Sequence, residues 1–451
     1  MKILRQSLVL VLLAGKILAA GTAMEGVVLA ENVLPQLEPV LTGAVQQSPA
    51  MLNRALDLEI AENNRIQSRA GLLPNLGGYA SYLKSRDTRA DLSGRLEVTK
   101  VAYNFSINQP VFYWGERLNA LKISEIQASI AKGQYQEGYR ALAQTLRNDY
   151  MRLIVLKLTV QRGETYASFT QKQLAKEETR LAQKVISEVQ IFPVRLAAEQ
   201  AQLNYERAQF DLEMAKLSFS RLSGRPPLSD NEIPDSIPVL AYDAGSYERL
   251  LAGFLSQEEL PAIEAVTLRK QLESGGLSLA NQKTRLRPKF NFLVGISQDE
   301  QSYTINVAQK YRVNSVFAGI SANWTIFDGL AAQAAVRNDL ARLRQMRTDY
   351  KVLNDRLAQQ AQTNARLINF SARNMSISDR ALLSGESNLK TKQEEFGRGV
   401  IAEDDVSLAR ITLYDAQINA VNGRSDFLNR VGDFLGTIMA DPVLDNVAFT
   451  P

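Results

Sequence analysis

Four stretches of the chain alternate between large apolar residues and small or polar ones. The alternation is regular in Val101–Asn108, Phe290–Ser297 and Val316–Trp324, and less regular in Leu76–Leu83. Because the side chains of a β-strand point alternately to opposite faces of its sheet, this period predicts strands with one apolar and one polar face. The stretches Lys84–Lys100 and Gln298–Arg312 are polar and charged, and we expect them to be the solvent-facing loops that join each pair of strands.

Most of the remaining chain is predicted to be helical. Amphipathic helices are expected over about Leu37–Arg69 and Tyr247–Arg285, the second with a break near Pro261. Very long helices follow each strand pair; one from Arg117 to Glu178 would measure about 90 Å. Their apolar residues fall at coiled-coil-like spacing, at Leu142, Leu146, Leu153, Leu156 and Val160, and at Val336, Leu340, Leu343, Tyr350 and Leu357.

These elements occur twice, because landmarks recur at a nearly constant offset. Pro74 corresponds to Pro288 (288 − 74 = 214) and Gly115 to Gly329 (329 − 115 = 214), and the segment at 185–188 resembles that at 400–403. An internal repeat indicates a duplicated structural unit. We predict a first repeat over residues 31–228, a linker over 229–246, a second repeat over 247–441 and a C-terminal tail over 442–451.

The N-terminus has the order of a secretory signal. Lys2 and Arg5 precede an apolar run, and small residues follow it. Residues 1–23 are therefore predicted to be a signal peptide, with cleavage after Ala23 or after Ala30; the alternative is a short N-terminal core helix. No other run of about 18 apolar residues occurs, so no membrane-spanning helix is expected.

Composition removes several kinds of chemistry. The 451 residues include no Cys and no His, so thiol or imidazole catalysis, common zinc sites and disulfides are not expected. The balance of 52 basic and 48 acidic residues leaves a net charge of +4 without a concentrated basic patch, which argues against nucleic-acid binding. We expect no catalytic residue, no metal site and no cofactor.

Four strands do not suffice for a closed membrane barrel, because the smallest such barrels have eight strands. Open sheet edges are not tolerated in hydrocarbon, so several chains must contribute to one barrel. An interfacial aromatic belt is expected near the strand ends, at Tyr113, Trp114, Trp324 and Phe327. The alternative is a soluble β-sandwich with ordinary core aromatics.

The segment Phe396-Gly-Arg-Gly399, followed by Asp405, Val406 and Ala409, resembles the turn between long helices in the TolC-like outer-membrane efflux protein family. The resemblance covers essentially the whole mature chain. It implies a mainly α fold with a small β part: a homotrimer whose 3 × 4 = 12 strands form one β-barrel, continued by a barrel of α-helices in the periplasm. It also implies a passive exit duct in the bacterial outer membrane, for efflux or type I secretion, which works with a periplasmic adaptor and an inner-membrane transporter.

The resemblance implies that the adaptor docks at helical turns. The first predicted docking turn comprises Phe396, Gly397, Gly399, Val400, Asp405 and Val406, and a second comprises Lys184, Val185 and Ile186. In the second turn Lys184 stands where Gly399 aligns, no Asp-Val pair follows, and Pro193 enters the returning helix.

Alternative hypotheses remain open from the sequence. Gly397 and Gly399 could belong to a phosphate loop, although no strand precedes them; Asp404 and Asp405 could be a metal or acid–base pair, or could cap the returning helix. The whole chain could instead be a periplasmic coiled-coil adaptor or scaffold without a pore, or an exported carboxylate-pair hydrolase.

Overall fold

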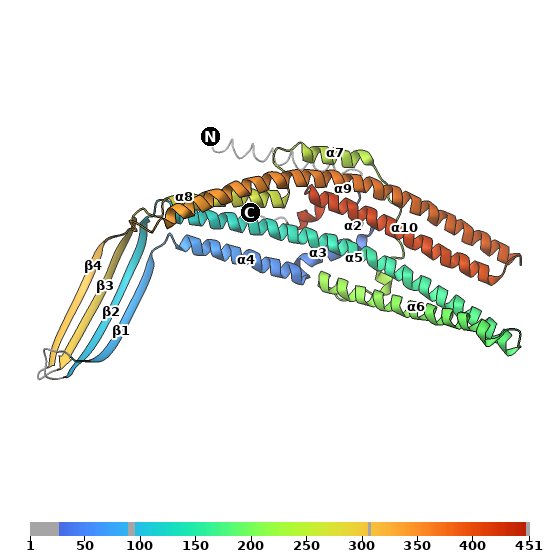
Figure 1. Ribbon diagram of the computed structural model, residues 1–451, viewed down its shortest axis with the longest axis horizontal. Helices are drawn as coiled ribbons and strands as arrows, with labels where there is room; N and C mark the ends of the chain where they lie inside the picture. Colours follow the sequence, from blue (N-terminus) through green and yellow to red (C-terminus); the bar gives the residue numbers. More distant parts are fainter. Residues whose placement is uncertain (1–26, 89–94, 305–307, 448–451) are drawn as a thin grey trace. The chain divides into compact units, whose positions relative to one another are not determined.

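The computed structural model describes residues 27–88, 95–304 and 308–447 (Figure 1). The predicted signal peptide, residues 1–23, lies outside the described residues. The described chain is mainly helical, with one antiparallel sheet of four strands. The predicted mainly α fold with a small β part is confirmed.

The sheet consists of two hairpins in the order β1-β2-β3-β4. Its strands are β1 (Asn75–Thr88), β2 (Arg95–Phe112), β3 (Lys289–Thr304) and β4 (Ala308–Asn323), and each pairs antiparallel with the next. The pairing of β2 with β3 joins the two copies of the repeat into one sheet. β1 and β4 are therefore its edges.

The strands continue well into the stretches that the sequence predicted to be loops. Much of Lys84–Lys100 and of Gln298–Arg312 is strand, which corrects that prediction. The polar residues are accommodated because oppositely charged side chains pair across the ladder, as Arg86 does with Glu97 at 3.0 Å. A charge on the exposed part of a strand therefore does not end it.

Short helices precede each hairpin. α2 (Ala30–Val33), η1 (Pro35–Leu37), α3 (Glu38–Gln47) and α4 (Pro49–Ala70) precede the first, and η2 (Asp230–Glu232), α7 (Ala244–Leu255) and α8 (Ile263–Lys283) precede the second. The break near Pro261 is confirmed. The single helix expected over Leu37–Arg69 is wrong, because Ser48 before Pro49 takes an extended conformation (ψ 128°) that interrupts it.

Long helices follow each hairpin. α5 (Glu116–Ala182) and α9 (Ala331–Gly397) each contain 67 residues, and the returning helices α6 (Glu188–Ser223) and α10 (Glu403–Thr437) contain 36 and 35. A last 3-10 helix, η3 (Pro442–Val447), follows. The equal lengths show the duplication directly.

The chain divides into two compact units that cut across the repeats. The sheet unit comprises Asp57–Lys132 and Thr267–Lys351, and the helical unit comprises Met1–Leu56, Gly133–Val266 and Val352–Pro451. Each copy contributes to both units. The predicted repeat and linker boundaries stay a prediction.

Within the helical unit the long helices form a row in the order α6, α5, α10, α9. Gly163 of α5 lies against Tyr205 of α6, Arg162 of α5 pairs with Asp415 of α10 at 2.5 Å, and Arg424 of α10 pairs with Asp379 of α9 at 2.8 Å. Figure 1 shows the same succession. The ends of the row are thus α6 and α9.

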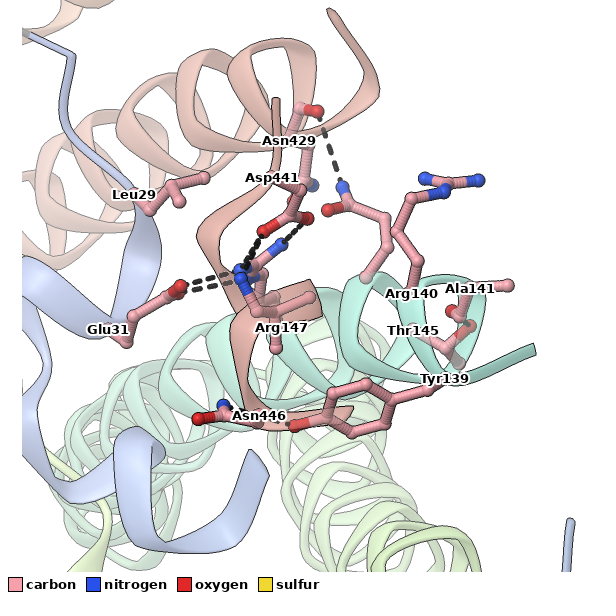
Figure 2. A network of polar contacts seen from close by, with 12 residues as sticks. Leu29, Glu31, Tyr139, Arg140, Ala141, Thr145, Arg147, Asn429, Asp441 and Asn446 are labelled. Carbon is pink, nitrogen blue, oxygen red and sulfur yellow. Dashed lines mark hydrogen bonds and ion pairs between the residues drawn. The ribbon is translucent and has the colours of Figure 1, made fainter. Parts of the chain in front are cut away.

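The core of the helical unit contains a buried ion-pair network (Figure 2). Arg147 of α5 is 2% exposed and donates to both Glu31 of α2 and Asp441 before η3, at 2.5–3.0 Å. Burial by itself lowers the pKa of Arg147, but the hydrogen bonds and charges of Asp441 and Glu31 outweigh burial and raise it. The guanidinium therefore stays charged and joins three segments distant in sequence.

Candidate channel wall and docking turns

The register of the sheet places large apolar residues from all four strands on one face. Phe105 lies opposite Ile296, which lies opposite Val316; Ile107 likewise lies opposite Val294. This apolar face comprises Leu76, Tyr82, Val101, Tyr103, Phe105, Ile107, Phe292, Val294, Ile296, Val316 and Ile320. It is largely exposed in the single chain, up to 84% at Val316. The alternation predicted from the sequence is confirmed.

The opposite face of the sheet carries mostly amide, hydroxyl and glycine positions. This polar face includes Asn104, Ser106, Asn108, Asn291, Gly295, Ser297, Ser315, Gly319 and Ser321. Its apolar exceptions include Tyr79, Leu83, Leu96, Val98, Leu293, Tyr311, Val313 and Phe317. A sheet with one exposed apolar face and one polar face can separate hydrocarbon from water.

The residues predicted to form the aromatic belt lie where the strands meet the helices, and both indoles are anchored. Trp114 Nε1 donates to the carbonyl of Pro288 at 2.7 Å, and Trp324 Nε1 donates to the carbonyl of Leu286 at 2.9 Å. Each Trp therefore binds the backbone just before the entry to β3. Arg287 stacks over the Trp114 ring at 4.7 Å.

The other two belt residues differ from each other. The Tyr113 hydroxyl donates to Asn291 Oδ1 at 2.8 Å, and Lys289 and Arg117 lie over its ring. Phe327 is 72% exposed. Cations placed beside aromatic rings at a strand end suit a boundary between hydrocarbon and charged headgroups. The assignment of these residues to a membrane interface stays a prediction.

The turn between α9 and α10 brings the predicted docking residues together. α9 ends at Gly397, Gly399 takes φ +72°, and the amide of Val400 donates back to the carbonyl of Glu395 at 3.0 Å. This is a Schellman-type end, in which a left-handed residue favours glycine. Phe396 and Val400 are exposed at 46% and 71%.

The two acidic residues after this turn have structural partners. Asp405 accepts a hydrogen bond from the amide of Ala402 at 3.2 Å, as part of the cap of α10, and Val406 is buried. Asp404 pairs with Lys176 of α5 at 2.6 Å, and this hydrogen bond lowers the pKa of its carboxyl. Of the two interpretations of the Asp404–Asp405 pair, helix capping agrees with these contacts, and Asp405 is the capping residue.

The second turn, between α5 and α6, has the same geometry despite its different sequence. Lys184 takes φ +61° where Gly399 takes +72°, and the amide of Val185 donates to the carbonyl of Arg180 at 2.9 Å. Val185 is 60% exposed, like Val400 in the other turn. Ile186 follows Val185 in the same turn.

Two residues of the second turn were missed by reading the sequence. Gln190 accepts from the amide of Ser187 at 2.9 Å and so takes the capping role of Asp405, and Ile191, fully buried, takes the place of Val406. Both lie 215 residues before their counterparts (405 − 190 and 406 − 191). The repeat offset, rather than residue identity, was the signal that could have found them.

Within the described residues, no group of three or more acidic side chains is arranged to hold a metal ion. The same part of the chain contains no helix with the length and apolarity needed to cross a bilayer. The candidate site thus consists of a two-faced sheet and two exposed helical turns.

Comparisons with known proteins find similarity to outer-membrane proteins. Residues 40–225 match the family model for outer membrane efflux proteins. The fold is similar to the outer membrane protein VceC of Vibrio cholerae (TM-score 0.61, 15% identity, 90% of this chain and 96% of that chain). It is also similar to the CmeC outer membrane channel of Campylobacter jejuni (TM-score 0.66, 12% identity, 91% and 88%) and to the MtrE outer membrane channel of Neisseria gonorrhoeae (TM-score 0.60, 15% identity, 90% and 89%). No curated protein sequence matches.

These findings confirm the predicted resemblance to the TolC-like outer-membrane efflux proteins, whose fold this chain has. The solved structures that share this fold include outer-membrane channels.

Proposed function

We propose that this protein is the passive outer-membrane exit duct of a tripartite efflux or type I secretion system, and that it works as a homotrimer. The observation that carries the proposal is the four-stranded sheet, with an exposed apolar face, a polar face and two open edges. Lipid would contact the apolar face, and cargo would pass along the polar one. Energy would come from the partner transporter.

The open edges argue for several copies in one barrel. In hydrocarbon, every backbone N–H and C=O must be paired, so β1 and β4 need strands from other chains. Three copies give 12 strands (3 × 4), which exceeds the eight of the smallest barrels and leaves room for a lumen. Copies related by a rotation axis join β4 of one to β1 of the next and leave no edge.

The two helical turns are proposed to contact the periplasmic adaptor. Their exposed apolar residues, Val400 and Phe396 in one and Val185 in the other, offer contact area at the ends of paired helices. Because the two turns share one backbone geometry, an adaptor could bind both in the same way. Passive conduction requires no bond to be made or broken, and we propose no catalytic role for any residue.

The test is the native mass of the protein extracted from isolated outer membranes, corrected for bound detergent. The proposal predicts three times the mass of the mature chain. A single chain recovered from soluble periplasm would contradict both the trimer and the barrel.

A further inference from the structure

The helix α6 carries an exposed apolar stripe that no described part of its own chain covers. The stripe recurs every seven residues, at Val189, Leu196, Leu203, Phe210 and Leu217, and its members are 44–82% exposed. The seam that α6 buries lies on its opposite side, at Ile191, Ala198, Ala208, Leu212 and Phe219. A seven-residue apolar repeat is the pattern of a helix that packs along another helix.

Acidic residues flank this stripe on one side. Glu199, Glu206 and Glu213 each follow a stripe residue by three positions, and all three are exposed. Among the described residues, none of them forms an ion pair; Glu206 accepts a hydrogen bond only from Gln202 of its own helix, at 2.9 Å. The charges are available to a partner.

The helix α9, at the other end of the row, has the complementary arrangement. Phe370 and Ile377, seven residues apart, are 65% and 57% exposed. Arg373 and Arg380 each follow one of them by three positions, and Arg366 continues the same seven-residue step. Within the described part of the chain these guanidinium groups have no carboxylate partner. Arg366, Phe370 and Arg373 also border an open groove of about 610 Å³ beside α7.

The two stripes cannot meet within one chain, because α5 and α10 lie between α6 and α9. They run in opposite directions, since α6 begins and α9 ends at the turns, and Lys176 near the end of α5 pairs with Asp404 at the start of α10. If copies stand side by side around an axis, α6 of one copy meets α9 of the next.

We propose that the α6 stripe of one copy packs against the α9 stripe of its neighbour as an antiparallel pair, held in register by three ion pairs. The pairs are Glu199 with Arg380, Glu206 with Arg373, and Glu213 with Arg366. The order is reversed because the helices are antiparallel, and the common step of seven residues lets all three form at once. This inference rests on the proposed homotrimer and names the surface that assembles it.

The geometry of a coiled coil supports the pairing. Glu199, Glu206 and Glu213 in α6, and Arg373 and Arg380 in α9, each follow an apolar stripe residue by three positions. Arg366 continues the same seven-residue step, three positions after Thr363, so the charged residues take the same place in the repeat of both helices. Two antiparallel helices related by a two-fold axis bring equivalent flanking positions to the same side of their seam. Charges at such positions choose the partner and its orientation. Opposite charges on the two helices favour α6 against α9 and disfavour either helix against its own copy.

The absence of Cys from the sequence makes disulfide trapping free of background. The full-length protein with Leu203→Cys and Ile377→Cys is oxidised in isolated outer membranes and run on a denaturing gel. The matched control carries Gln202→Cys and Ser376→Cys, two exposed positions at the same level of the helices but off the stripes. We expect covalent dimers and trimers from the stripe pair at ten or more times the yield of the control.

A charge exchange tests the register. Glu206→Arg alone should reduce the cross-linking yield several-fold, and adding Arg373→Glu should restore it, because the exchanged pair keeps its attraction. A native mass of three chains with stripe cross-linking no higher than the control would overturn this interface while leaving the proposed function intact. A native mass of one chain would instead overturn the proposed function itself.

Discussion

The network around Arg147 gives the sharpest quantitative prediction. Its guanidinium makes four hydrogen bonds with two carboxylates, Glu31 and Asp441, and the side chains of Arg147 and Asp441 are 2% and 0% exposed. Replacing Arg147 with Met keeps the length of the side chain but leaves two negative charges without their cation. Removing one partner of a buried ion pair costs about 3–5 kcal/mol. We therefore expect Arg147→Met to lower the free energy of unfolding by about 4 kcal/mol.

The assay is denaturant unfolding of the detergent-solubilised protein, followed by circular dichroism at 222 nm. Arg152→Met is the matched control, because Arg152 lies on the same helix and is exposed. A change within about 0.5 kcal/mol is expected for the control. If Arg147→Met and Arg152→Met shift the unfolding midpoint equally, the reasoning about the buried network is refuted.

A second variant separates lost charge balance from lost packing. Adding Asp441→Leu to Arg147→Met removes one of the two unpaired carboxylates. Because an apolar replacement of a buried ion pair is often neutral, the double variant should recover part of the lost stability. Further destabilisation by the second substitution would instead indicate that packing, not charge, accounts for the effect.

Three further predictions concern the sheet, a turn and a buried phenol. Val316→Arg on the apolar face should destabilise the protein in lipid by about 2–4 kcal/mol and reduce the amount of assembled protein in the outer membrane. Ser315→Arg on the polar face should assemble normally. An equal reduction of assembled protein by both substitutions would contradict the orientation of the sheet. Lys184→Gly should stabilise the protein by about 0.5–1 kcal/mol, because Lys184 holds φ +61°, and Gly399→Lys should do the reverse; both are read from unfolding midpoints. Burial raises the pKa of Tyr150 to about 12, so its contribution to stability is complete below pH 10 and is lost as the pH rises to 12. We therefore expect the unfolding midpoint of Tyr150→Phe to fall less steeply over that range than the midpoint of the unsubstituted protein. Equal slopes would contradict the raised pKa of Tyr150.

Much of the fold could be predicted because the signals were periodic. The alternation in Val101–Asn108 and Phe290–Ser297 gave the strands and their faces, and the absence of Pro over long stretches gave the long helices. The wrong predictions arose where one local signal was outweighed. The charged residues of Lys84–Lys100 predict a loop, but cross-strand ion pairs such as Arg86 with Glu97 sustain β-structure there. The amphipathic pattern over Leu37–Arg69 predicts one helix, but Pro49 ends the helix α3 at Ser48.

The sites were harder to predict because geometry, not residue type, is what the repeats share. Lys184 holds a backbone conformation that favours glycine, and Gln190 caps a helix as Asp405 does. Comparing residue identities between the two repeats therefore does not reveal that the second turn has the geometry of the first. The pairing of Arg147 with Glu31 and Asp441 spans 116 and 294 residues of sequence, and no local pattern marks such a contact. Only the folded chain brings these residues together.

The central claim is that copies of this chain enclose a water-filled duct, and single-channel conductance in a planar lipid bilayer tests it most directly. The purified protein, added in detergent, is predicted to produce discrete, reproducible conductance steps. Val316→Arg at the same concentration should produce few insertions, and Ser315→Arg should insert normally with an altered step, because a cation then faces the lumen. A protein that enters the bilayer without any conductance step, or whose step is changed by neither substitution, would contradict the account.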